Sequence, residues 1–271
     1  MTIADVHFAI GQTHDICQDY GLAEDPAQSG LAEHLAQAIV CDGCSSSPNT
    51  DWGARFIARA AATAFRPFDP ANVVQRADIY RNTLQLAPQS LDATLLMIRE
   101  TPDHDAEVIA HGDGVIVARR RDGTYQHWSI TFSHNAPSYL SYLLDKNRLE
   151  TYLAAGGQRL INGGDVTPAD PREAVRQVFP RAEYDVVLVM TDGATSFQKR
   201  DGTRFVPVPL EDVLHQIMDF KTLTHGFIKR RLGRFLGKFC EQNGWAHNDD
   251  FAVAGMVLDL PAEGSTPAPQ A

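Results

Sequence analysis

Residues 38–43 read AIVCDG, and residues 186–193 read VVLVMTDG. Both are short apolar runs rich in β-branched residues, a pattern typical of buried strands, and both end in Asp-Gly. A carboxylate at the end of a buried strand is unfavourable unless it is paired or binds a cation, and the glycine lets the backbone turn away from it. The two stretches therefore predict that Asp42 and Asp192 deliver oxygen ligands to one point.

Similar apolar runs predict further strands, and helical spacing predicts several helices between them. Thr50 or Asp51 is the expected N-cap of the first helix, which Pro67 should stop. Strands do not alternate regularly with helices, so we expect an α+β sandwich and not a doubly wound parallel sheet. The predicted strands are 6–10, 36–41, 94–98, 107–110, 115–118, 186–190 and 251–258, and the predicted helices are 51–65, 72–86, 138–154, 171–178, 210–220 and 223–240.

The composition limits the class of protein. The 271 residues contain 34 Asp and Glu against 24 Lys and Arg, a net charge of −10, which argues against a general nucleic-acid binder. No apolar run reaches the roughly 20 residues that span a bilayer, and no secretory signal is visible, so no membrane partner is expected. Four cysteines are too few for a disulfide scaffold, and we expect a cytoplasmic protein with reduced thiols. One domain over 1–260 and a disordered tail over 261–271 are predicted.

Other aspartates lie beside predicted strands in the same way. Asp19 follows the first strand, and Asp249 and Asp250 precede the last. An all-oxygen set suits hard cations such as Mg²⁺ or Mn²⁺, while ordinary turns and caps remain the alternative explanation. The Asp-Gly pairs at Asp122 and Asp201 lie among polar residues and predict simple turns.

These residues resemble the motifs of the metal-dependent type-2C protein phosphatases, the PPM family. Six segments match in the family's order from about residue 11 to residue 258. Each is a weak signal alone, but together they are specific. The segments are GQTHDICQDY, AIVCDGCSSS, LDATLLMI, VIAHGDGVIVARRRDG, VVLVMTDGATSF and NDDFAVAGMVL.

The resemblance implies a four-layer α-β-β-α sandwich with two Mg or Mn ions at one end. It implies that Asp42 bridges the ions, that the Gly43 carbonyl and Asp192 are further ligands, and that Asp249 binds one ion. Asp19 would act through water on a metal. Asp113 with Asp192 matches a third ion position, and a plain hairpin turn is the equal alternative for Asp113.

Two positions depart from the family pattern. His14 stands where an arginine usually clamps the phosphate, and a surface-loop histidine is the alternative explanation. Cys44 and Ser45 replace a histidine and a glycine after Asp42-Gly43. We expect His14, Cys44 and Ser45 to bind substrate, with His14 as a catalytic candidate beside Asp42 and Asp192. Cys41 and Cys44 form a CxxC pair, for which burial of Cys41 is favoured over zinc, and disulfide regulation is a weaker hypothesis. The departures suggest an atypical bacterial branch.

The leading hypothesis is a monomeric Mg/Mn-dependent hydrolase of phosphoserine and phosphothreonine in proteins, acting through direct attack by a hydroxide between two ions. A noncatalytic sensing or scaffolding module and a hydrolase of small phosphate esters are the alternatives.

Overall fold

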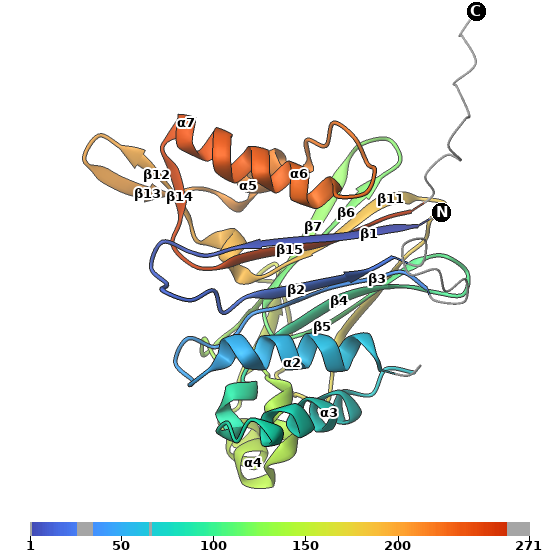
Figure 1. Cartoon of the computed structure of the whole chain (residues 1–271), viewed down its shortest axis with the longest axis vertical. Helices are drawn as coiled ribbons and strands as arrows, with labels where there is room; N and C mark the ends of the chain where they lie inside the picture. Colours follow the sequence, from blue (N-terminus) through green and yellow to red (C-terminus); the bar gives the residue numbers. More distant parts are fainter. Residues whose placement is uncertain (1, 26–34, 65–66, 259–271) are drawn as a thin grey trace, which may run out of the picture.

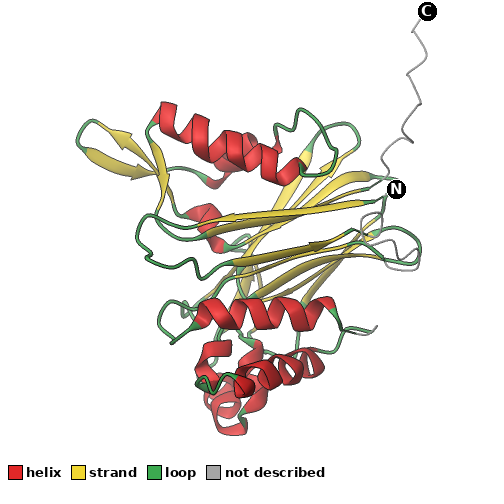
Figure 2. Cartoon of the chain, viewed as in Figure 1, coloured by secondary structure: helices red, strands yellow, loops and turns green. Residues whose placement is uncertain are grey.

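The computed structural model describes residues 2–25, 35–64 and 67–258. Two antiparallel sheets stack face to face, and helices cover the outer side of each sheet (Figures 1 and 2). The predicted α+β class and the four-layer α-β-β-α arrangement are confirmed. The predicted tail at 261–271 lies outside the described residues. None of the described helices combines the length and apolar character that crossing a bilayer requires.

The larger sheet has seven strands in the order β1-β15-β11-β6-β7-β8-β9. β11 lies inside this sheet and pairs antiparallel with both β15 and β6. The bounds are β1 Ile3–Ala9, β15 Phe251–Val257, β11 Tyr184–Met190, β6 Gly114–Arg120, β7 Tyr125–Phe132, β8 Gln158–Ile161 and β9 Asp165–Pro168.

The second sheet has five strands in the order β10-β5-β4-β3-β2. Their bounds are β10 Val175–Phe179, β5 Ala106–His111, β4 Leu95–Glu100, β3 Gln37–Cys41 and β2 Tyr20–Glu24. A separate three-stranded sheet in the order β13-β12-β14 projects from the body of the molecule (Figure 1). It consists of β12 Phe197–Asp201, β13 Arg204–Pro207 and β14 Trp245–His247.

Helices α2 Thr50–Ala62 and α3 Pro70–Thr83 cover the five-stranded sheet, and α5 Leu210–Met218 and α6 Phe227–Arg234 cover the seven-stranded sheet (Figure 1). The π-helical turn η4, Phe235–Cys240, and the short helix α7, Glu241–Asn243, continue α6. The remaining helical elements are η1 Pro88–Leu91, η2 Leu140–Leu144, α4 Lys146–Ala154 and η3 Asp192–Thr195.

Alternation along the strands builds the layers. Val187 and Val189 of β11 point into the apolar cluster between the two sheets. Leu188 and Met190 point the other way, into the cluster beneath α5 and α6. Because both faces of β11 are buried, its sequence is a continuous apolar run. A third cluster, which includes Ile39 and Ile57, joins β3 to α2.

The structure corrects several predicted elements. Residues 171–178 were expected to be helical, but β10 occupies Val175–Phe179 and pairs with β5. The predicted helix 138–154 is interrupted at Asp145, whose side chain caps α4 by accepting from the amides of Asn147 and Arg148. The predicted helix 223–240 begins only at Phe227 and changes to a π turn.

The start of α2 also differs from the expectation. The helix begins at Thr50, and its N-cap is Asn49 in a left-handed conformation, not Thr50 or Asp51. The helix ends at Ala62, before the expected stop at Pro67. Strands β2, β7, β8, β9, β12, β13 and β14 were missed, because several are short and largely polar.

Candidate functional site

Strand register brings the predicted ligand residues to one end of the sandwich. Tyr20 pairs with Cys41 in the β2–β3 ladder. Asp19 precedes Tyr20 and Asp42 follows Cys41, so both lie at the same end of these two strands. Asp42 is fixed by Thr94, because its amide donates to the Thr94 hydroxyl at 3.0 Å and its carbonyl accepts from the Thr94 amide at 2.8 Å. These contacts place the first two carboxylates side by side.

The second pair of carboxylates comes from the other sheet. Met190 of β11 pairs with Val115 of β6. Asp192 lies two residues after Met190 and Asp113 lies two residues before Val115, so both lie at the same end of this ladder. Asp113 occupies the turn between β5 and β6, flanked by Gly112 and Gly114, which both have positive φ. The expected hairpin is wrong, because β5 and β6 belong to different sheets; Asp113 lies instead in the connection between the two sheets and beside Asp192.

Glycine follows Asp42 and Asp192 because the backbone is closely packed there. A Cβ on Gly193 would lie 1.8 Å from the Asp250 carbonyl oxygen, and one on Gly43 would lie 2.6 Å from the Thr50 carbonyl oxygen. Neither glycine has a positive φ, unlike the glycines on either side of Asp113. The Asp-Gly pairs are therefore explained by close approach of another segment.

Asp19 is the most buried of these residues, 1% exposed. The Thr191 hydroxyl donates to its Oδ2 at 2.7 Å, while its buried Oδ1 has no hydrogen-bond partner within the described part of the protein. Burial raises the pKa of Asp19 well above its usual range, and the charges of Asp250 and Asp192 add to the effect. An orphaned buried carboxylate oxygen is costly, so this atom points to a missing donor or cation.

Carboxylates raise one another's pKa throughout the cluster. Burial followed by the charges of Asp19, Asp192 and Asp113 raises the pKa of Asp42 well above its usual range. Burial and the charge of Asp192 raise the pKa of Asp113 to about 7, and burial and Asp249 raise that of Asp192 to about 6. Asp42, Asp113 and Asp192 are only half-buried, so solvent reaches the centre of the cluster.

Asp249 and Asp250 have different partners. Asp250 is buried and fastens the loop between β1 and β2, because its carboxylate accepts from the amides of Gly11 at 2.8 Å and Gln18 at 2.5 Å. Asp249 is 44% exposed in its side chain. Asp250 therefore has a structural role, and Asp249 keeps its carboxylate accessible.

His14 contacts these same two aspartates. Its Nδ1 lies 3.0 Å from Asp250 Oδ2, and its Nε2 lies 3.5 Å from Asp249 Oδ1. Burial alone lowers the pKa of His14, but the contact with Asp250 and the charges of both aspartates outweigh it and raise the pKa. The structure thus places His14 at the site, between two carboxylates whose contact raises its pKa.

The Cys44 loop follows Asp42 at the same end. Cys44 is half-buried, its Sγ lies 3.1 Å from Ser46 Oγ, and Ser45 is exposed. Burial tends to raise the pKa of Cys44, but hydrogen bonds from Ser46 and Tyr139 outweigh it and lower the pKa. The Tyr139 hydroxyl was not anticipated from the sequence, since it lies in a segment expected to be plain helix.

Asp92 is a second residue that the sequence did not single out. Its carboxylate accepts from Ser47 Oγ at 2.9 Å, and both of its oxygens accept from Arg148 Nη2 at 3.0 Å. Its carbonyl accepts from the Cys44 amide at 2.9 Å. Asp92 thus joins the Cys44 loop to α4, a contact between segments that local sequence patterns do not reveal.

The proposed metal ligands have the chemistry that hard divalent cations require. They are carboxylates and carbonyls, which suit Mg²⁺ and Mn²⁺, and no lysine or arginine of the described residues is among the principal groups that set their pKa values. Within 2–25, 35–64 and 67–258, however, no three His, Cys, Asp or Glu side chains are already closed around a single point. The chemistry and the orphaned Asp19 oxygen fit a cation, and the side chains would have to close on it.

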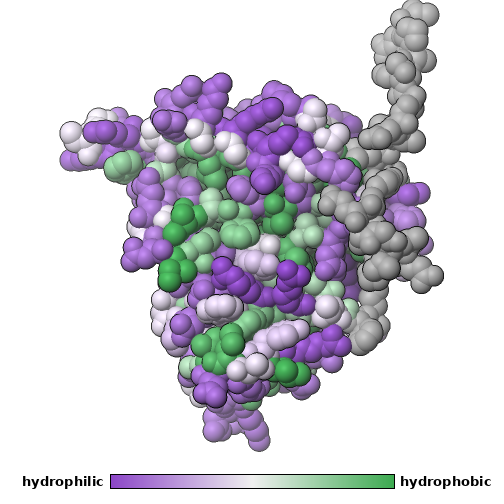
Figure 3. Space-filling model, in the orientation of Figure 1, coloured by the Kyte–Doolittle hydropathy of each residue, from purple (hydrophilic) through white to green (hydrophobic). Residues whose placement is uncertain are grey.

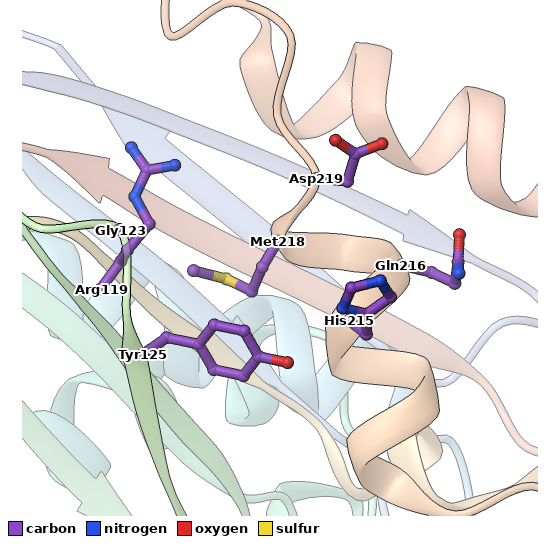
Figure 4. A pocket seen from close by; sticks show the side chains of 7 residues that line it. All are labelled: Arg119, Gly123, Tyr125, His215, Gln216, Met218 and Asp219. Carbon is purple, nitrogen blue, oxygen red and sulfur yellow. The ribbon is translucent and has the colours of Figure 1, made fainter.

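Two other features lie apart from this cluster. A hollow of about 300 Å³ lies at the opposite end of β6, lined by Arg119, Tyr125, His215 and Met218 among others (Figure 4). It holds none of the predicted site residues. The four cysteines are all free, and Cys41 is fully buried in the apolar cluster beneath α2.

Comparison with known proteins identifies the family. The family model described as Protein phosphatase 2C matches residues 11–237, which leaves out Asp249 and Asp250. Serine/threonine phosphatase Stp1 from Staphylococcus aureus is 14% identical, with 96% of each chain covered and a TM-score of 0.56. The catalytic domain of serine threonine protein phosphatase PstP, solved in complex with two manganese ions, is 14% identical, with 95% of this chain and 99% of that chain covered and a TM-score of 0.52.

At these identities the solved structures show the fold alone, and no curated protein matches the sequence. The family match covers most of the chain, and the sandwich it implies is the one described above. The chain belongs to the protein phosphatase 2C family.

Proposed function

We propose that this protein is a Mg²⁺- or Mn²⁺-dependent phosphatase of phosphoserine and phosphothreonine in proteins. The observation that carries the proposal is the convergence of Asp19, Asp42, Asp113 and Asp192 at one end of the sandwich. Their pKa values are raised by burial and by one another, and no arginine or lysine of the described residues is among the principal groups that set them. A group of like charges in a partly buried site is stabilised by binding cations.

The residues have distinct roles in this proposal. Asp42, the Gly43 carbonyl, Asp192 and Asp249 would hold two ions, Asp19 would contribute through water, and Asp113 with Asp192 would offer a third position. Two divalent cations, when bound, supply Lewis-acid stabilisation of the phosphoryl oxygens and activate water as the nucleophile. Thr94 and Thr191 orient Asp42 and Asp19 through the hydrogen bonds given above.

Substrate contacts fall to the residues beside this cluster. His14 is positively charged more readily than a free histidine, so it is suited to attract a phosphate and to hold a proton near the leaving oxygen. The Cys44 thiol and the exposed Ser45 hydroxyl border the other side, and Asp92 fixes their loop. Protein substrates are supported by the likeness to PstP, which is described as a serine threonine protein phosphatase, and to Stp1, which is described as a serine/threonine phosphatase.

Hydrolysis of p-nitrophenyl phosphate by purified protein, with Mn²⁺, Mg²⁺ or EDTA, tests the proposal. We expect turnover that requires a divalent cation and is followed by release of phosphate from phosphoserine and phosphothreonine peptides. Turnover of p-nitrophenyl phosphate without turnover of any peptide would favour a hydrolase of small esters. Well-folded protein with no activity in any divalent metal would contradict the proposal and favour a noncatalytic module.

A further inference from the structure

The hairpin formed by β12 and β13 is built into the chain between two of the proposed ligands. β12 begins at Phe197, five residues after Asp192, and β14, which pairs with β12, ends at His247, two residues before Asp249. The Phe197 ring packs 5.3 Å from that of Phe251, the residue after Asp250. The base of the hairpin is therefore fixed beside the carboxylate cluster.

From this base the hairpin extends into solvent. Every residue from 199 to 205 is exposed, and the strands project from the body of the molecule (Figure 1). At about 3.3 Å per residue, the five residues of β12 span roughly 17 Å. This separation of the tip from the base beside the cluster is one that a few extended residues flanking a phosphorylated side chain can span.

The hairpin is basic, although the whole chain is acidic. Lys199, Arg200 and Arg204 oppose Asp201 alone, while the protein carries a net charge of −10. No carboxylate of the described residues forms an ion pair with these three cations, and Arg200 Nε donates only to the Gly202 carbonyl at 3.1 Å. Arg99, Arg119 and Arg148, by contrast, are each paired with a carboxylate.

An apolar side chain accompanies these charges. Arg200 pairs with Phe205 across the ladder, so the two lie on one face of the hairpin, and Phe205 is 57% exposed. Elsewhere the arm is mostly hydrophilic (Figure 3). β13 is also an edge strand, so its outer backbone groups are available to an extended peptide.

We infer that the β12–β13 hairpin is a docking arm for an acidic segment next to the phosphorylated residue of the substrate protein. This inference rests on the proposed function and adds a substrate preference to it. The candidate site lacks the usual arginine, and the acidic chain as a whole repels an anionic peptide. The unpaired cations of the arm supply the local attraction, and electrostatic complementarity of this kind mainly determines partner choice and association rate.

Two phosphopeptides that differ only in their flanks provide the test, one flanked by Asp and Glu and the other by Ser and Ala. Wild-type protein should prefer the acidic peptide, and in Lys199→Glu/Arg204→Glu the ratio of the two kcat/KM values should fall about fivefold. The matched control is Arg234→Glu/Lys238→Glu, which changes the charge equally at two exposed positions on the α6–η4 helix and should leave the ratio unchanged. Circular dichroism confirms that each variant is folded.

Binding of a fluorescein-labelled acidic peptide without phosphate, measured by anisotropy, tests the arm independently of catalysis. We expect binding that weakens with salt and in the hairpin variant but not in the control. Inactivity of the wild type on every phosphate ester would contradict the proposed function, and the anisotropy result would still decide the inference. Several outcomes overturn it: no preference for acidic flanks, an equal effect of the control, or a wild-type dimer that the hairpin variant dissociates.

Discussion

The two ends of the sheet sandwich treat their carboxylates in opposite ways. At the end away from the candidate site, Asp185 accepts two hydrogen bonds of 2.9 Å from Arg119, and Glu107 accepts from Arg99 at 2.7 Å. Burial alone would raise the pKa of Glu107, but the hydrogen bond and charge of Arg99 outweigh it and lower the pKa. At the candidate site, carboxylates meet other carboxylates, and the pKa values rise.

This difference separates carboxylates that stabilise the fold through ion pairs from carboxylates that we propose bind cations. Both ends bury carboxylates on strands of the same sheets, so burial by itself does not mark a site. At the far end Asp185 and Glu107 have arginine partners, and Glu100 accepts from the Thr2 hydroxyl and the Ala36 amide, so these carboxylates are satisfied without a ligand. At the near end, no arginine of the described residues is a principal partner of Asp19, Asp42, Asp113 or Asp192, and in our proposal cations balance these charges.

The largest expected effect comes from removing one unpaired carboxylate. Asp192→Asn should lower kcat for p-nitrophenyl phosphate roughly a thousandfold or more, because several kcal/mol of charge stabilisation depend on the ions it holds. Calorimetry should show loss of Mn²⁺ binding, while circular dichroism stays unchanged. Asp122→Asn is the matched control, since Asp122 is also followed by glycine but lies exposed in a turn and accepts from Thr124. Activity of Asp192→Asn close to the wild type would refute the assignment.

Breaking an ion pair at the far end should lower the stability of the protein but leave its activity nearly unchanged. Arg119→Ala leaves Asp185 without its partner, so we expect a loss of about 1–2 kcal/mol in the free energy of unfolding. Urea denaturation measures the loss, and kcat should remain within a factor of two. In EDTA at pH 7.5, Asp192→Asn should instead be at least as stable as the wild type, because it removes repulsion. A destabilised Asp192→Asn protein in EDTA would contradict the proposed difference between the ends.

The stability of the metal-free protein should fall as the pH rises through the range in which the cluster ionises. The pKa of Asp113 is raised from 3.8 to about 7 and that of Asp192 to about 6, so the folded state binds more protons than the unfolded state between about pH 4 and pH 7. Their stabilisation is complete below pH 4 and is lost as the pH rises through the folded pKa values, by an amount on the order of 1–3 kcal/mol. Urea denaturation in EDTA measures it.

The variant Asp113→Asn separates the contribution of the carboxylate cluster to the pH dependence of stability from the contributions of other titrating groups. His111 acts in the opposite direction, because burial followed by the charges of Arg176 and Arg159 lowers its pKa to about 3. Its contribution is present above pH 6.5 and is lost as the pH falls, in the wild type and the variant alike. The difference between the two proteins therefore reports on the cluster, and identical pH profiles would refute its coupling.

The smallest effect is expected at His14. His14→Gln removes the imidazole between Asp249 and Asp250, so kcat/KM for p-nitrophenyl phosphate should fall about tenfold, as is typical of losing one proton donor or charge-assisted contact. His14→Arg keeps the positive charge and should retain more activity than His14→Gln. Equal activity of wild type and His14→Gln would place the histidine outside the phosphate site.

Much of the fold was predictable from local pattern. The apolar runs that end at Cys41 and Met190 are strands β3 and β11, and Phe251–Val257 is β15, because strands buried on both faces have continuous apolar sequences. β10 was predicted as a helix, because four polar or charged residues in 171–178 obscured its alternation. The hairpin of β12 and β13 was also missed, because its residues are mostly polar and form no apolar run.

For the candidate site, the sequence singled out the residues that we propose carry the chemistry. Asp19, Asp42, Asp192 and Asp249 were singled out because each borders a predicted strand, and Asp113 because of the family resemblance; ladder register then brings the strand ends together. The pairing of His14 with Asp250, the hydrogen bond of Tyr139 to Cys44, and the Asp92–Arg148 pair were decided by tertiary structure alone. These contacts join residues far apart in the chain, so only packing of the layers brings them within reach. Spacing predicts which end of a strand a side chain occupies, but only the folded chain decides what it faces there.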